Sequence, residues 1–226
     1  MIDGHCHILP DCDDGSQNIE QSINMLKAAK DCGIDKIIFT SHIKDHYAGF
    51  DYQKQAYEKI FPYAQKLNIK TALGAEINWK QLSDVDFGQF KEMTLGNSNL
   101  FLLELSSVSL TSSWETIIYK LLGEGYKVII AHPERYHYVH EDMQILDAFI
   151  DAGCLIMMSG TSLCKPVFGP RTFKCAKKML KLGLVDIIAS DAHTPHSYQL
   201  FLKALKFGAK FGYNTKTADT ILDEAF

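Results

Sequence analysis

Short apolar runs alternate with longer stretches of helical period along most of the chain. The strand-like runs are Met1–His5, Lys36–Thr40, Lys70–Ala75, Leu100–Leu105, Lys127–Ala131, Cys154–Met158 and Asp186–Ala189. The helical patterns are Ile19–Cys32, Tyr52–Leu67, Trp114–Gly123, Asp142–Ala152, Arg171–Leu182 and Tyr198–Phe207. Strands that alternate with helices at this spacing predict βα units and a mainly parallel sheet. Seven such strands favour a closed or nearly closed β/α barrel, with an open doubly wound sheet as the alternative.

Turn and cap residues support these boundaries. Ser16 is the predicted N-cap of the first helix, and Gly33, Gly153 and Gly183 follow three of the predicted helix ends, where glycine is the expected stop. The stretch Trp79–Asn99 has no clear period and predicts a short helix with loops. With no repeat or linker in its 226 residues, the chain is predicted to form a single domain, 1–226.

Composition narrows the class of protein. The net charge is -4, the isoelectric point is about 6.1 and no basic block occurs, which argues against a nucleic-acid partner. No apolar run approaches the roughly 20 residues of a membrane span, and the N-terminus lacks a signal-peptide pattern. Six scattered cysteines without a C-x-x-C pair indicate reduced thiols and a cytoplasmic protein.

Arginine is scarce. Of 23 basic residues only Arg135 and Arg171 are arginine. In a lysine-biased chain, arginine is expected to persist where lysine cannot replace it, for example at a bidentate clamp on phosphate or carboxylate. Both residues are therefore candidate anion-binding groups.

Imidazoles and carboxylates follow the predicted strands. His5 and His7 share one face of the first strand because side chains alternate along it. Six of the seven strands end in or near such a group, and with Asp14 the set is His5, His7, Asp14, His42, Glu76, Glu104, His132, Asp191 and His193. Any one of these, taken alone, is more often an ordinary loop or core residue. Their convergence at the active end of a barrel would be costly without cations, so together they predict a metal site.

Nine groups are too many for one ion. Zinc sites use four or five ligands and magnesium keeps most of its waters, so the set suggests two or three divalent ions. Imidazoles and carboxylates without thiolates fit manganese, iron or zinc better than calcium, and magnesium remains an alternative. Clustered divalent ions suit the hydrolysis of phosphate esters.

The motifs resemble those of a known family. They are His5-Cys6-His7-Ile8-Leu9-Pro10, Asp13-Asp14-Gly15-Ser16, Thr40-Ser41-His42, Gly74-Ala75-Glu76, Ala131-His132-Pro133-Glu134-Arg135-Tyr136 and Ser190-Asp191-Ala192-His193. In this order they resemble the polymerase-and-histidinol-phosphatase (PHP) superfamily. Within it, the chain looks like the bacterial manganese-dependent protein-tyrosine phosphatases of capsule and exopolysaccharide synthesis.

The resemblance implies a distorted β/α barrel of seven strands that holds three ions. His5, His7, Glu76 and Asp191 would hold the first, Glu76, Glu104 and His132 the second, and Asp14, His42 and His193 the third. Arg135 and Arg171 would bind the substrate phosphate while a metal-bridging hydroxide attacks phosphorus. The substrate implied is the tyrosine-rich tail of a bacterial tyrosine autokinase.

Two departures leave the substrate less certain than the metal chemistry. Ile43 replaces a polar residue of the family's motif, and Met158 stands where a polar amide is expected. Histidinol phosphate or another small phosphomonoester is the alternative substrate, and a metal-stabilised domain that binds phosphotyrosine without turnover is the alternative outside enzymes. A thiol phosphatase built on Cys164 and Arg171 is rejected, because prolines interrupt the loop and its length is wrong.

Overall fold

The computed structural model describes residues 1–82, 87–110, 112–164 and 167–226. Its strands are all parallel and form two sheets. One sheet has the order β1 (Ile2–Asp3), β2 (Lys36–Phe39) and β4 (Lys70–Leu73). The other has the order β3 (His42–Ile43), β5 (Glu76–Asn78), β6 (Leu100–Glu104), β7 (Lys127–Ala131), β8 (Leu155–Ser159) and β9 (Ile187–Ala189).

The two sheets are halves of one barrel. β3 continues the line of β2 after a two-residue break, and β5 continues that of β4, so the strands occupy the seven predicted positions. The amide of Glu76 donates to the carbonyl of Ser41 at 3.2 Å and thereby carries the ladder across the break. On the other side, Cys6 forms a parallel bridge with Ala192, and the Asp191 amide donates to the His5 carbonyl at 2.8 Å. Hydrogen bonds therefore connect β9 back to β1, which confirms the predicted barrel.

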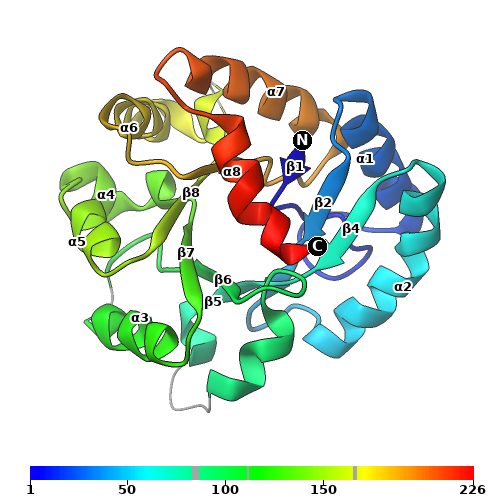
Figure 1. Cartoon of the computed structure of the whole chain (residues 1–226), viewed down its shortest axis with the longest axis horizontal. Coiled ribbons are helices and arrows are strands. Elements are labelled where there is room, and N and C mark those ends of the chain that lie inside the picture. The colour runs from blue at the N-terminus through cyan, green and yellow to red at the C-terminus, as the bar shows by residue number, and fades with distance from the viewer. Residues whose placement is uncertain (83–86, 111, 165–166) are drawn as a thin grey trace.

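Helices surround this barrel (Figure 1). They are α1 (Ile19–Asp31), α2 (Phe50–Lys66), α3 (Trp114–Gly123), α4 (His137–Glu141), α5 (Ile145–Asp151), α6 (Gly169–Leu182), α7 (Pro195–Ala209) and α8 (Thr215–Leu222). Short 3₁₀ turns at Trp79–Leu82 and Phe87–Met93 agree with the expectation for Trp79–Asn99, of which residues 83–86 lie outside the described part. Within the described residues, no helix has the length and apolarity that a membrane crossing requires.

The predicted helices and strands are found, mostly within one to three residues of their bounds, but α4, α8 and the short β3 and β5 were not predicted. The predicted N-cap was wrong. Asn18 caps α1, because its side chain accepts from the amide of Gln21 at 2.9 Å. The hydroxyl of Ser16 instead donates to the Asn18 carbonyl, also at 2.9 Å, and lies 2.8 Å from the hydroxyl of Ser22.

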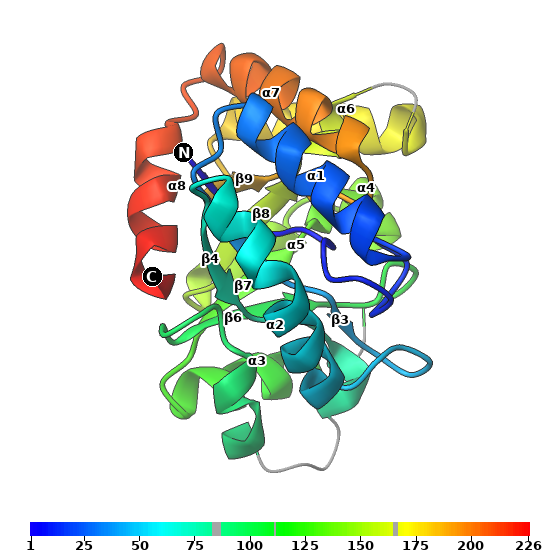
Figure 2. The same ribbon diagram turned by 90° about the vertical axis from the view of Figure 1, so that its right-hand side faces the viewer.

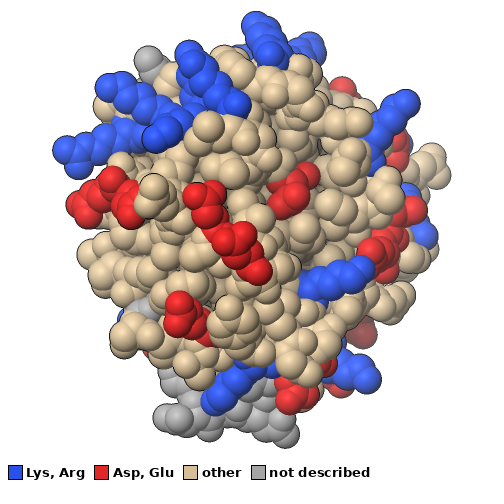
Figure 3. All heavy atoms as spheres, turned by 60° about the vertical axis from the view of Figure 1, so that its left-hand side comes forward, with Lys and Arg blue, Asp and Glu red and all other residues tan. Residues whose placement is uncertain are grey.

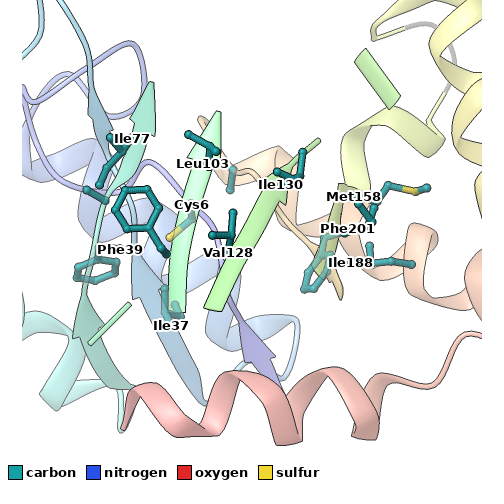
Figure 4. Close-up of a cluster of buried hydrophobic side chains, with 14 of the residues drawn as sticks. Cys6, Ile37, Phe39, Ile77, Leu103, Val128, Ile130, Met158, Ile188 and Phe201 are labelled. Carbon is teal, nitrogen blue, oxygen red and sulfur yellow. The ribbon is translucent and has the colours of Figure 1, made fainter. Parts of the chain in front are cut away.

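Alternation along the strands divides the buried residues into two cores. Outward-facing residues pack against the surrounding helices; Figure 4 labels Ile37, Phe39, Leu103, Val128, Ile130, Met158 and Ile188 in this outer core. The alternate positions Ile38, Leu100, Leu102, Ile129, Met157 and Ile187 fill the barrel interior. Side chains of a strand point to opposite faces in turn, so each buried strand serves both cores.

Helix α8 completes the interior core. Its buried face is formed by Ala218 and Leu222, which pack with the inward-facing strand residues. In Figure 1 this helix crosses the barrel end near the amino terminus of β1, and in Figure 2 it lies on the side opposite β3. One end of the barrel is thus covered by apolar packing, and the other end is left for the polar groups that follow the strands.

Candidate metal centre

The first two histidines extend from β1 into the carboxyl end of the barrel. The Nε2 atoms of His5 and His7 lie 3.3 Å apart, and Cys6 between them points into the outer core. Both imidazoles face the carboxylate of Glu76, whose Oε2 is 3.6 Å from His5 and 3.5 Å from His7. The Oδ1 atom of Asp191 is 3.2 Å and 3.3 Å from the same two nitrogens. These atoms could share one ion, as the resemblance implies.

Glu76 lies at the centre of the site. It is fully buried, and its Oε1 lies 2.7 Å from His132 Nε2 while its Oε2 lies 2.8 Å from His42 Nδ1. Burial alone would raise the pKa of this carboxyl, but the charges of His42, His5 and His132 outweigh burial and hold the pKa well below its usual range. Glu76 is therefore a buried carboxylate that keeps its negative charge.

A second group of ligand atoms lies nearer the surface. His7, Asp14, His42 and His193 bring donor atoms within 4.8 Å of one another. A hydrogen bond from His193, with the charges of nearby histidines, lowers the pKa of Asp14 to about 2 although burial opposes it. A third group joins His42, Glu76 and Glu104, and Asn78 holds Glu104 by donating to its Oε2 at 2.8 Å.

Two of the predicted ligands follow strand ends in strained backbone conformations. His132 has φ 33° and Asp191 has φ 49°, in the left-handed region that residues with a Cβ seldom adopt. Such strain costs on the order of 1–3 kcal/mol and persists where the surrounding structure enforces it. Here it turns the two side chains toward Glu76 and toward the His5–His7 pair.

All nine predicted ligands thus lie in one connected cluster. Buried atoms without a hydrogen-bond partner indicate whether this cluster suits metal ions. Glu76 Oε2, His42 Nδ1 and His132 Nδ1 are buried without a hydrogen-bond partner in the described part of the chain. The first two lie 2.8 Å apart without hydrogen-bond geometry, so they converge without satisfying each other. Unsatisfied buried donors and acceptors are costly, and a cation bound between Glu76 Oε2 and His42 Nδ1 would satisfy both of these atoms. The donor set therefore fits divalent ions.

Similarity to known proteins agrees with this geometry. The family model for capsular polysaccharide synthesis proteins of the CpsB/CapC type matches residues 1–222. This chain belongs to the CpsB/CapC family. It is 29% identical to the tyrosine-protein phosphatase YwqE of Bacillus subtilis over 236 residues, covering 98% of this chain and 91% of the relative.

The chain is similarly related to the tyrosine-protein phosphatase CpsB of Streptococcus pneumoniae, at 30% identity over 225 residues, 93% of this chain and 92% of the relative. A solved structure, from work on YwqE and CpsB as metal-dependent tyrosine phosphatases, superposes with a TM-score of 0.80. That match has 28% identity and covers 100% of this chain and 96% of the other. These findings confirm the resemblance inferred from the motifs.

In this CpsB/CapC family member, Arg135 lies directly beside the ligand cluster. Its Nη2 donates to the hydroxyl of Ser159 at 2.7 Å and forms an ion pair with Asp191. Thr161 and Ser162 also accept from this guanidinium, at 3.3 and 3.4 Å. β8, the strand that supplies no ligand, therefore ends in the hydroxyl groups that hold the arginine.

Arg171 is placed differently. It lies in the first turn of α6, is exposed, and lines a cavity together with His140 and Lys174. Within the described residues its guanidinium makes no contact with the nine-residue cluster. A role for Arg171 at the phosphate stays a prediction.

Some functional residues were missed from sequence, above all Asp13. Its Oδ2 accepts from His7 Nδ1 at 2.8 Å and from the His42 amide at 2.9 Å, so it orients two ligands. Burial opposes ionisation of Asp13, but the charge and hydrogen bond of His7 keep its pKa far below the usual range. The adjacent motif Asp13-Asp14-Gly15-Ser16 was the available signal.

The two departures from the family pattern are explained by where they face. Met158 packs in the outer core, and its neighbour Met157 faces the barrel interior. Ile43 is partly buried against the outer core. Cys164 carries no sign of a nucleophile, since burial raises its pKa.

Proposed function

We propose that this chain is a manganese-dependent protein-tyrosine phosphatase. The observation that carries the proposal is the buried Glu76 carboxylate, which is surrounded by the imidazoles of His5, His7, His42 and His132 within the cluster of nine candidate ligands. Family membership adds support, because the relatives YwqE and CpsB are tyrosine-protein phosphatases.

In this proposal the ligands divide among three ions. His5, His7, Glu76 and Asp191 would hold one, Glu76, Glu104 and His132 a second, and Asp14, His42 and His193 a third. Divalent ions at these positions would activate water and offset phosphoryl charge. His42 Nδ1 lies 2.8 Å from Glu76 Oε2, so in this proposal His42 could also bind the second ion.

Arg135 is proposed to bind the reacting phosphoryl group. Its guanidinium is preorganised by three hydroxyl groups, and its planar fork matches two phosphoryl oxygens at once. In the transition state negative charge is spread over the three equatorial oxygens, so a fixed cation placed at them would stabilise that state. Tyrosine, with a pKa of about 10, is a better leaving group than a serine alkoxide. Arg171 would contact the substrate further from the reacting atoms.

The proposed physiological substrate is the tyrosine-phosphorylated tail of an autokinase of capsule synthesis, in the cytoplasm. The family's association with capsular polysaccharide synthesis supports the setting. All six cysteines are unpaired, which suits a reducing compartment. Residues 1–226 are proposed to act as one phosphatase domain.

The deciding experiment compares steady-state hydrolysis of a tyrosine phosphopeptide with that of histidinol phosphate, in manganese and after chelation. We expect a higher kcat/KM for the phosphopeptide and loss of turnover on chelation, with recovery when manganese is restored. If histidinol phosphate were preferred, the metal centre would stand and the substrate would be wrong. If binding of the phosphopeptide occurred without any turnover in manganese, the domain would be a binding module.

A further inference from the structure

A cavity of about 460 Å³ lies between α4 and α6, outside the metal centre. We call it the α6 groove. Its cationic lining comes from Arg171, Lys174 and Lys178 of α6, with His140 of α4. Apolar atoms of Val139 form part of the wall, and Glu141 contributes a carboxylate. Figure 3 shows Lys and Arg side chains gathered along the upper left of this face, on the side where Figure 1 places α6.

The three cations of α6 form one row with no acidic partner. Arg171, Lys174 and Lys178 follow i, i+3 and i+7 spacing, so they lie on the same side of the helix. All three are exposed, and none makes an ion pair with any described residue. By contrast, Lys36 pairs with Asp223 and Lys127 with Glu224 elsewhere on the surface. The row is therefore free to bind an anionic partner from outside the chain.

The groove is connected to the mouth of the metal centre through Phe168. The guanidinium carbon of Arg135 lies 3.9 Å from the centre of the Phe168 ring. Phe168 also lines a second cavity of about 350 Å³ that shares His140, Glu141 and Arg171 with the α6 groove. Phe168 thus contacts the proposed phosphate-binding arginine and also lines a cavity that Arg171, the first cation of the row, shares.

We propose that the α6 groove binds an acidic segment next to the target phosphotyrosine in the protein substrate; this rests on the proposed phosphatase function. Seven helical positions separate the ends of the row by about 10.5 Å. In an extended peptide, side chains on the same face recur about every 6.6 Å, so two or three carboxylates match such a row. A single phosphate dianion is compact and would engage only part of it.

The test uses the full chain loaded with manganese and phosphotyrosine peptides of equal length. Two peptides carry aspartates, one on the amino side of the phosphotyrosine and the other on the carboxyl side. Two matched peptides carry asparagines at the same positions. Two further peptides carry a second phosphotyrosine on one side or the other. We expect kcat/KM for one aspartate peptide to exceed that of its asparagine match by about 3- to 10-fold at low salt, as exposed ion pairs allow. At 0.5 M salt the ratio should approach one.

Two double variants then test whether the α6 groove causes the preference for aspartate. In K174Q/K178Q the aspartate-to-asparagine ratio should fall to about one. The control K206Q/K210Q removes the same charge from two exposed positions, Lys206 in α7 and the C-cap residue Lys210, and should keep the wild-type ratio. Equal turnover of all peptides by the wild type would overturn the groove proposal and leave the phosphatase function intact. A preference for the second phosphotyrosine over aspartate would show that the occupant is wrong. Absence of turnover on every peptide in manganese would instead remove the proposed function itself.

Discussion

Asp13 offers the sharpest test of how the site is organised, because it is not one of the nine ligands. Its buried carboxylate accepts from His7 Nδ1 at 2.8 Å, from the His42 amide at 2.9 Å and from the Gly15 amide at 2.9 Å. With the proton of His7 held at Nδ1, the lone pair of Nε2 faces Glu76 and Asp191. A carboxylate in this position fixes the tautomer of a metal-binding histidine and makes it a stronger ligand.

Asp13→Asn keeps the size of the side chain and removes its charge. The amide has one acceptor oxygen for three donors, so one donor must face its NH₂ group. A hydrogen bond to a charged group contributes about 1.5–3 kcal/mol, and loss of such partners weakens metal binding about 10- to 100-fold. We therefore expect the Kd for manganese to rise about 10- to 100-fold, with turnover partly restored at high manganese.

The measurement is a manganese titration by calorimetry, with circular dichroism to confirm that the variant is folded. The matched control is Asp11→Asn, an exposed neighbour whose carboxylate lies 3.4 Å from the Tyr52 hydroxyl and contacts no ligand. It should bind manganese like the wild type. A folded Asp13→Asn protein with a Kd within threefold of the wild type would refute the reasoning, since Asp13 would then only stabilise the turn.

Three further predictions use other parts of the molecule. Arg135→Lys keeps the charge but loses the planar fork, so kcat/KM for a tyrosine phosphopeptide, measured at saturating manganese, should fall about 10- to 100-fold. Leu222→Ala opens a gap in the interior core beneath α8 and should lower the free energy of unfolding by about 2–5 kcal/mol in urea titrations. Asp13 raises the pKa of His7, whereas Asp14 has a pKa of about 2, so on acidification a proton competes for His7 while Asp14 stays ionised. Manganese affinity should therefore fall as the pH is lowered below the raised pKa of His7, by up to about tenfold per unit for each proton taken up; an affinity that stays constant from pH 8 to pH 5 would contradict this.

The clustering of the nine candidate ligands could be predicted because all of them except Asp14 lie at or just after the carboxyl end of a predicted strand. Parallel strands bring their carboxyl ends to one face, so order along the chain was enough to place Glu76 near His132, 56 residues away. The strand Lys127–Ala131 and the helix Trp114–Gly123 were predicted at their observed bounds because apolar period and flanking residues agree there. Local pattern and tertiary packing favour the same structure in these segments.

The remaining features depend on contacts between distant segments. β3 and β5 are two and three residues long, too short for a periodic signal, and are defined only by pairing with each other and with β6. Helix α8 is amphipathic but is positioned by the open barrel end that it covers, which no local pattern reveals. The role of Asp13 depends on the turn that brings it back to His7, six residues earlier. Met158 stands where a polar amide was expected, and alternation along β8 turns Met157 inward and Met158 outward.

The candidate site lies where the barrel closes. The seam of the barrel is the Cys6–Ala192 bridge, and the ligands His5 and His7 flank one side of that bridge while Asp191 and His193 flank the other. Only a few backbone hydrogen bonds hold β9 to β1 there, such as the one from the Asp191 amide to the His5 carbonyl. An ion shared by His5, His7 and Asp191 would connect the two strands independently of the backbone. Because a ligand that binds only the folded chain stabilises it, metal binding and closure of the barrel should be coupled at this seam.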